Sequence, residues 1–99
     1  MDYNLPKRVE TEIIELAKKY NINKVILFGS RARDDNHERS DIDLAAYFNT
    51  SSMYADFCDD VENIRTLLMF DIINLNSDLI DLDLRKSIND EGVVLYEKI

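Results

Sequence analysis

The stretch VILFGSRARDDNHERSDIDLAAYF, residues 25–48, decides the fold of this chain, because two strand patterns in it flank one charged loop. The unbroken apolar run 25–28 is typical of a buried strand, and Gly29 ends it. Residues 31–40 are charged and predict an exposed loop. Residues 41–48 then alternate well enough to predict a second strand. One face of that strand is expected to carry Ile42, Leu44, Ala46 and Phe48.

Helices and further strands are predicted on both sides of this stretch. Apolar residues at helical spacing predict helices at 5–20, 56–68 and 81–90. Apolar runs predict two more strands, at 70–75 and 93–96. The order of elements favours an α/β (α+β) fold with a single mixed sheet of about four strands flanked by helices.

The length of 99 residues, 45% of them apolar, allows one domain over residues 1–99 with one modest core. A catalytic centre fits in such a chain, but little material remains for a separate substrate-recognition domain. We therefore expect a partner to supply part of any substrate site.

The formal net charge of -8 argues against stable nucleic-acid binding, which depends on Lys and Arg to neutralise phosphates. Carboxylates suit hard cations such as Mg²⁺ instead. The single cysteine, Cys58, excludes a disulfide within the chain and a cysteine-based zinc site, and it is expected to be a small core residue. With no apolar run long enough to cross a membrane and no signal sequence, the chain is expected in the cytoplasm.

Asp41 and Asp43 are two residues apart on a predicted strand, so their side chains leave the same face. Like charges held this close repel each other unless a cation lies between them, which suggests a metal site. The alternative is a solvated strand face. Asp71 lies in an apolar run and needs a partner if that strand is buried, either a metal or an arginine such as Arg65 or Arg85.

Gly29 and Ser30 follow a buried strand directly, where a tight turn can present backbone N–H groups and a hydroxyl to an anion. Such a turn can bind phosphate, although Gly-Ser pairs are also common in ordinary turns. The segment is neither a Walker loop nor a dinucleotide-binding fingerprint, because it lacks the required Lys and the repeated glycines.

The segment FGSRARDDNHERSDIDLAAY, residues 28–47, resembles the signature of minimal nucleotidyltransferases of the DNA polymerase beta superfamily. That signature is Gly-Ser, a spacer of about ten residues, then Asp-x-Asp, and Asp71 falls where the family places a third carboxylate. Element order and the closing EGVVLYEKI extend the resemblance over essentially the whole chain. One departure is Asp34, where many relatives have glycine; Asp tolerates a left-handed backbone, but its charge and that of Asp35 disfavour a triphosphate.

The resemblance implies an enzyme that transfers a nucleotide, AMP from ATP, to a hydroxyl group. Two Mg²⁺ ions would be held by Asp41, Asp43 and Asp71, and the phosphates of ATP by Gly29, Ser30, Arg31 and Arg33. For the two arginines, pairing with Glu38 or Asp35 on the surface is an equal alternative.

The resemblance also implies an antitoxin role with a small helical partner of the HEPN type as the acceptor, and a homodimer is compatible with it. A second hypothesis is a binding module that neutralises this partner by occlusion, without catalysis. A third is an acidic metal-binding domain with no nucleotide site.

Overall fold

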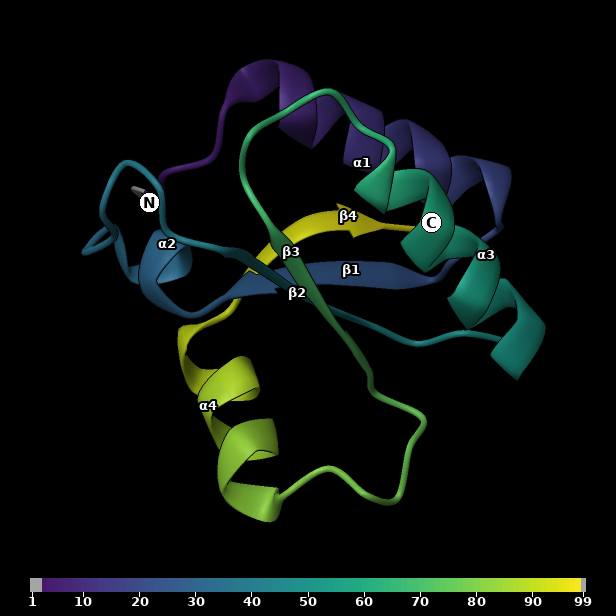
Figure 1. Cartoon of the computed structure of the whole chain (residues 1–99). Coiled ribbons are helices and arrows are strands. Elements are labelled where there is room, and N and C mark those ends of the chain that lie inside the picture. Colours follow the sequence, from purple (N-terminus) through teal and green to yellow (C-terminus); the bar gives the residue numbers. More distant parts are fainter. Residues whose placement is uncertain (1–2, 99) are drawn as a thin grey trace.

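Four strands and four helices make up the computed structural model, which describes residues 3–98 (Figure 1). The strands are β1 Lys24–Phe28, β2 Ile42–Ala46, β3 Phe70–Asn74 and β4 Val93–Glu97. The helices are α1 Lys7–Lys19, α2 Ser30–Arg33, α3 Ser51–Glu62 and α4 Leu82–Glu91. The sheet order is β3, β2, β1, β4, with β2 and β3 parallel and the other pairs antiparallel. The predicted fold with one mixed four-stranded sheet is confirmed.

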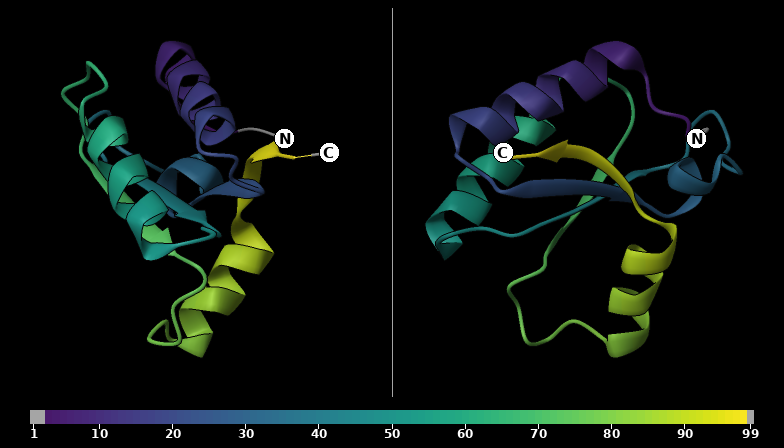
Figure 2. Two further views of the ribbon diagram at one scale, coloured as in Figure 1. Left: turned by 90° about the vertical axis from the view of Figure 1, so that its right-hand side faces the viewer. Right: turned by 180° about the vertical axis from the view of Figure 1, so that it is seen from behind.

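Helices cover the two faces of the sheet unequally (Figure 2). On one face, α1 and α3 pack against alternate residues of the strands, including Leu27 of β1 and Leu44 of β2. On the other face, α4 contributes Ile88 to a smaller cluster with Ile26 and Ala45. Because side chains alternate along a strand, the main core takes one set of residues and leaves the intervening set for the opposite face.

Helix α1 forms where the sequence predicts it. Val9, Ile13 and Ala17 recur every four residues and are fully buried against the sheet, while charged residues occupy the exposed side. Pro6 stands at the N-cap, where its missing N–H costs no helical hydrogen bond. Burial of one apolar stripe therefore accounts for this helix.

Helix α3 begins and ends about five residues earlier than predicted. The hydroxyl of Thr50 accepts a hydrogen bond from the Met53 N–H at 3.1 Å, which caps the helix start, and Asn63 ends it. Leu67 was counted into the helical pattern but lies beyond the helix and is fully exposed. A helix forms here, but the predicted bounds 56–68 were wrong, because apolar residues at helical spacing continue past the end of the helix at Asn63.

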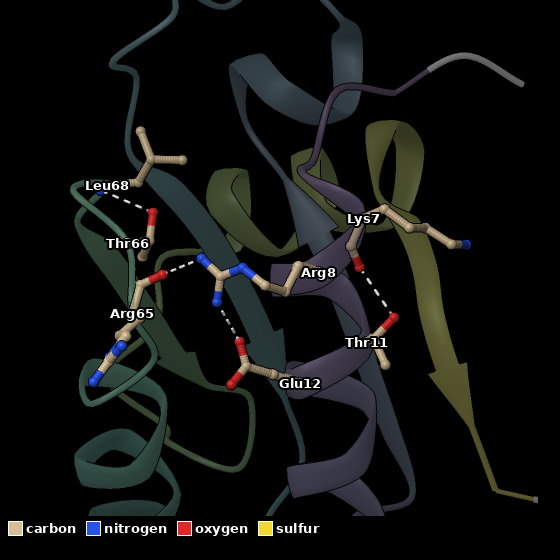
Figure 3. A network of polar contacts seen from close by, with 7 residues as sticks. All are labelled: Lys7, Arg8, Thr11, Glu12, Arg65, Thr66 and Leu68. Carbon is tan, nitrogen blue, oxygen red and sulfur yellow. Dashed lines mark hydrogen bonds and ion pairs between the residues drawn. The ribbon is translucent and has the colours of Figure 1, made fainter.

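The segment after α3 is tied to α1 through Arg8 (Figure 3). The Arg8 guanidinium donates to the backbone oxygen of Arg65 and, at 2.9 Å, to the carboxylate of Glu12. A few residues on, the Ile42 N–H donates to the Met69 oxygen at 2.8 Å at the start of the ladder between β2 and β3. These contacts place the beginning of β3, and hence Asp71, against β2.

Two further predictions are corrected or refined. The charged segment 31–40 is not all loop, because Ser30–Arg33 forms the short helix α2. Cys58 is half-buried on α3 rather than a full member of the core. Within residues 3–98 no helix combines the length and apolarity needed to cross a membrane.

Candidate active site

The turn at Gly29 joins β1 to α2 and lies against the carboxylate of Asp43. Gly29 has φ +76°, a conformation that L residues rarely adopt, and a Cβ added there would lie 2.3 Å from Asp43 Oδ2. Any side chain at this position would displace the carboxylate. The predicted proximity of the Gly-Ser turn to the Asp-x-Asp pair is therefore present, and glycine is what permits it.

The register of the sheet brings the acids together from two strands. Asp43 of β2 is the Cα partner of Phe28, the residue before Gly29, on one side and of Asp71 in β3 on the other. Partners in a parallel ladder share a face of the sheet, so Asp43 and Asp71 are neighbours. Asp41 immediately precedes β2 and is exposed, as is Asp71, while Asp43 is half-buried.

Electrostatic repulsion acts on Asp43. Its pKa is raised above the ordinary aspartate value, first by burial, then by the charges of Asp71 and Asp41, and it is partly lowered by Arg33. Both predicted acids therefore act on the same carboxylate. A cation at this point would relieve the repulsion, so the donor set, three carboxylates with excess negative charge, suits a hard divalent ion.

The three acids nevertheless do not form a preformed metal-binding site. Within residues 3–98 no three His, Cys, Asp or Glu side chains are grouped closely enough to hold a metal ion. The chemistry of the donors fits Mg²⁺, whereas the side-chain arrangement would have to tighten around it.

The alternative partners considered for Asp71 are not found. Arg85 donates to the backbone oxygens of Leu75 at 2.8 Å and Ser77 at 2.9 Å. Across residues 3–98 no salt bridge links Asp71 to Arg65 or to any other basic side chain. Asp71 also needs no buried partner, because the edge position of β3 leaves it exposed to water.

Arg31 is occupied by the protein itself. It is 2% exposed, and its guanidinium donates to the backbone oxygens of Asn4 at 3.1 Å, Ser40 at 3.1 Å and Glu38 at 3.2 Å. These bonds hold the loop that delivers Asp41 and tie the N-terminal segment to α2. Within residues 3–98 its side chain reaches no carboxylate, so the surface pairing with Glu38 or Asp35 is not found for Arg31, and the side chain is turned away from solvent.

Arg33 is the arginine whose charge acts on Asp43. It forms salt bridges to Asp35 and to Glu91 of α4, both at 3.0 Å, and its charge lowers the pKa of Asp43. The pairing with Asp35 is the surface alternative that the sequence left open. Glu91 was missed, because 58 residues separate it from Arg33 and no local pattern connects them.

Asp34 ends α2 in the left-handed conformation, with φ 61° and ψ 32°. This confirms the expectation that an aspartate takes the backbone conformation for which many similar proteins use glycine. Ser30 lies at the first position of α2, directly after Gly29.

Comparisons with known proteins agree with this geometry. The sequence model of the family described as "Polymerase beta, Nucleotidyltransferase" matches residues 11–99. A search of curated proteins gave no match.

Several solved structures share the fold. A toxin-antitoxin structure with AMP-PNP has a TM-score of 0.72 and 21% identity, covering 90% of this chain and 73% of that one. A tri-AMPylated Shewanella oneidensis HEPN toxin in complex with an MNT antitoxin gives 0.67 and 18%, covering 93% and 72%. A structure described as a candidate minimal nucleotidyltransferase gives 0.72 and 24%, covering 94% and 95%. At these identities the likeness concerns the fold, whereas the family match spans most of the sequence, and the chain therefore belongs to the polymerase beta nucleotidyltransferase family.

Proposed function

We propose that this protein transfers AMP from ATP to a hydroxyl group of a partner protein of the HEPN type and thereby acts as an antitoxin in the cytoplasm. The observation that carries the proposal is the register of β2 and β3, which sets Asp43 beside Asp71 and against the turn at Gly29.

ATP would be held at the Gly29 turn. Ser30 offers a hydroxyl there, and Arg33 is half-exposed and close enough to act on the charge of Asp43, so it can also meet a phosphate. Arg31 would act indirectly by holding the loop before Asp41. The placement of the triphosphate beside three carboxylates requires charge neutralisation.

Asp41, Asp43 and Asp71 would hold two Mg²⁺ ions. Bound there, Mg²⁺ supplies neutralisation of the triphosphate and a lowered pKa for the attacking hydroxyl. The raised pKa of Asp43 comes first from burial and then from the charges of Asp71 and Asp41, and a cation would remove this second contribution. Asp71, exposed on the edge strand, would orient the acceptor hydroxyl.

In the reaction, the acceptor oxygen forms a bond to the α-phosphorus of ATP. The bond from that phosphorus to the bridging oxygen breaks, pyrophosphate leaves with the electron pair, and the hydroxyl proton passes to solvent. Positioning of the reactants and charge stabilisation account for most catalysis of this kind.

A protein acceptor agrees with the net charge of -8, which disfavours tRNA and other polyanions. The solved structures with the same fold include a HEPN toxin that is AMPylated and bound to its MNT antitoxin. By analogy, the first acceptor to test is the product of the adjacent gene, which the proposal predicts to be a small helical protein.

The test is incubation of the purified protein with α-labelled ATP, GTP, CTP or UTP, Mg²⁺ and the product of the adjacent gene. We expect label from ATP on the partner protein, dependent on Mg²⁺ and absent with Asp43→Asn. Arg39→Gln, an exposed change outside the proposed site, is the control that should retain transfer. Absence of label with all four nucleotides and a folded partner would refute the transfer reaction.

Occlusion without catalysis is the second candidate, favoured by the lack of a preformed metal-binding group within residues 3–98. The double variant Asp41→Ala and Asp43→Ala separates the two. We expect it to bind the partner but fail to protect cells. Protection equal to that of the wild type would establish occlusion.

A further inference from the structure

A furrow runs along β3 on the side that carries no neighbouring strand. Among residues 3–98, β3 is an edge strand paired only with β2, and three hollows lie along it. The first hollow contains Met69, the middle one Asp71 and the third Leu79. The first and middle hollows share Glu62 and Phe70, and the middle and third share Tyr54 and Ile72. Because neighbouring hollows share walls, they form one surface, which we call the β3 furrow.

The furrow is floored by β3 and walled by α3 in its middle part. The hydroxyl of Tyr54 on α3 donates to the backbone oxygen of Ile72 at 2.9 Å, which holds helix and strand together there. At one end lies Met69, 69% exposed, and at the other Leu79, 95% exposed. A partner lying along this surface could bury both of these exposed apolar side chains.

The charge of the furrow has one sign. The described residues that line these three hollows include four carboxylates and neither Lys nor Arg, whereas Arg39 lines the next hollow, beyond Leu68 at the Met69 end. The four acids are Asp59, Glu62, Asp71 and Asp81. Such a surface repels nucleic acid and complements a polypeptide that carries basic side chains among apolar ones.

Asp71 belongs both to the furrow and to the candidate active site with Asp41 and Asp43. It borders the middle hollow and is the ladder partner of Asp43. A chain lying in the furrow would therefore pass beside the point where the acceptor hydroxyl is needed, with apolar hollows on both sides of that point to hold it.

We propose that the β3 furrow docks the acceptor protein through a segment that combines apolar and Lys or Arg side chains, and presents its hydroxyl at Asp71. The inference rests on the proposed function for the reaction but concerns binding alone. It predicts that docking needs no nucleotide, no Mg²⁺ and no intact Asp43.

Cys58 makes the furrow directly testable, because it lines the middle hollow and is the only cysteine of the chain. The rate of its alkylation by a maleimide can be followed by mass spectrometry without nucleotide. The probe is a synthetic ten-residue peptide of alternating Lys and Leu, compared with one of alternating Glu and Leu and with a ten-nucleotide RNA. We expect the basic peptide alone to protect Cys58, at least about fivefold at saturation.

Variants locate the protection. The double change Asp59→Lys and Glu62→Lys should weaken binding of the basic peptide at least about tenfold. The control Asp90→Lys and Glu97→Lys makes an equal change of charge outside the furrow and should leave peptide binding within about twofold of the wild type. Leu79→Ser should weaken peptide binding, while Val94→Ser, at an exposed apolar residue of β4 that lines none of these hollows, should not. A cysteine placed at Thr11 on α1 in a Cys58→Ser background should remain unprotected.

Three results would overturn the inference. They are equal weakening of peptide binding by both pairs of charge changes, protection of Cys58 by the acidic peptide or by RNA, and no protection of Cys58 up to about 1 mM basic peptide. Asp43→Asn separates the two proposals. If it abolishes transfer and Cys58 is still protected, both stand; if Cys58 is protected but the wild type never transfers a nucleotide, only the proposed function fails.

Discussion

The face of the sheet under α1 and α3 and the face that carries the acids differ in how completely they are covered. The first buries a core from both helices and three strands, including Ile13, Ile42 and Phe57, none of them exposed. The second is covered by α4 around Ile88 and left open at Asp41 and Asp71. Apolar burial stabilises the first, and water or a cation must solvate the second, so the candidate site lies where the helical cover ends.

The largest effect on this comparison is expected from Phe57→Ala in the covered face. Phe57 packs with ring centroids 5.5 Å from Phe48 and 6.4 Å from Tyr20. Its loss removes buried area and leaves a cavity, lowering the free energy of unfolding by about 3–5 kcal/mol. Urea denaturation measures it. Leu67→Ala, at an exposed leucine, should change stability by less than about 0.5 kcal/mol, and equal effects of the two would contradict the described core.

Arg31→Met comes next, because it removes the buried donor beneath the loop that leads to Asp41. Each backbone oxygen left without a donor lowers the free energy of unfolding by about 1–3 kcal/mol. Because water can enter and satisfy some of the three oxygens, we expect a total loss near the upper end of the range for one oxygen. A lysine can donate to only some of these backbone oxygens, so the loss of stability in Arg31→Lys should lie between zero and that of Arg31→Met. Arg39→Met, at an exposed arginine, is the control in the same urea series. Full stability of Arg31→Met would show that these bonds do not support the loop.

Asp43→Asn should change stability in a pH-dependent way. A raised pKa in the folded state means that ionisation of Asp43 costs stability, a cost absent below the unfolded pKa and complete once pH has risen through the folded pKa. The variant should therefore melt at a higher temperature than the wild type at pH 7.5 and at the same temperature at pH 3. Added Mg²⁺ should narrow the gap at pH 7.5 by stabilising only the wild type. A difference in melting temperature that does not change with pH would show that ionisation of Asp43 is not its cause.

The smallest effect is expected from Asp34→Gly. Asp34 occupies a left-handed conformation that costs a non-glycine residue about 1 kcal/mol, and glycine also gains freedom when unfolded, so a net gain below about 1 kcal/mol is expected. Asp35→Gly is the control, and it should destabilise, because it removes the salt bridge to Arg33 without relieving strain. Loss of stability in Asp34→Gly would mean that its side chain supports the turn.

Much of the fold followed from local patterns. The stripe of Val9, Ile13 and Ala17 predicts α1, and the alternation after Asp41 predicts which side of β2 faces the main core, because both depend only on the geometry of one element. The start of α3 was missed although Thr50 signalled it, since apolar residues continued past the helix end. The left-handed backbone at Asp34 was expected from the family resemblance, in which glycine is common at this position, together with the tolerance of Asp for that conformation.

The sequence by itself determined that a Gly-Ser turn, an Asp-x-Asp strand and a third acid exist, and that one face of each strand is apolar. Only the tertiary structure decided that Asp71 pairs with Asp43, that Arg31 turns inward while Arg33 meets Glu91, and that β3 stays at the edge with a furrow beside it. The reason is physical: period and residue type are properties of a single segment, whereas register, burial and edge position depend on which distant segments pack together.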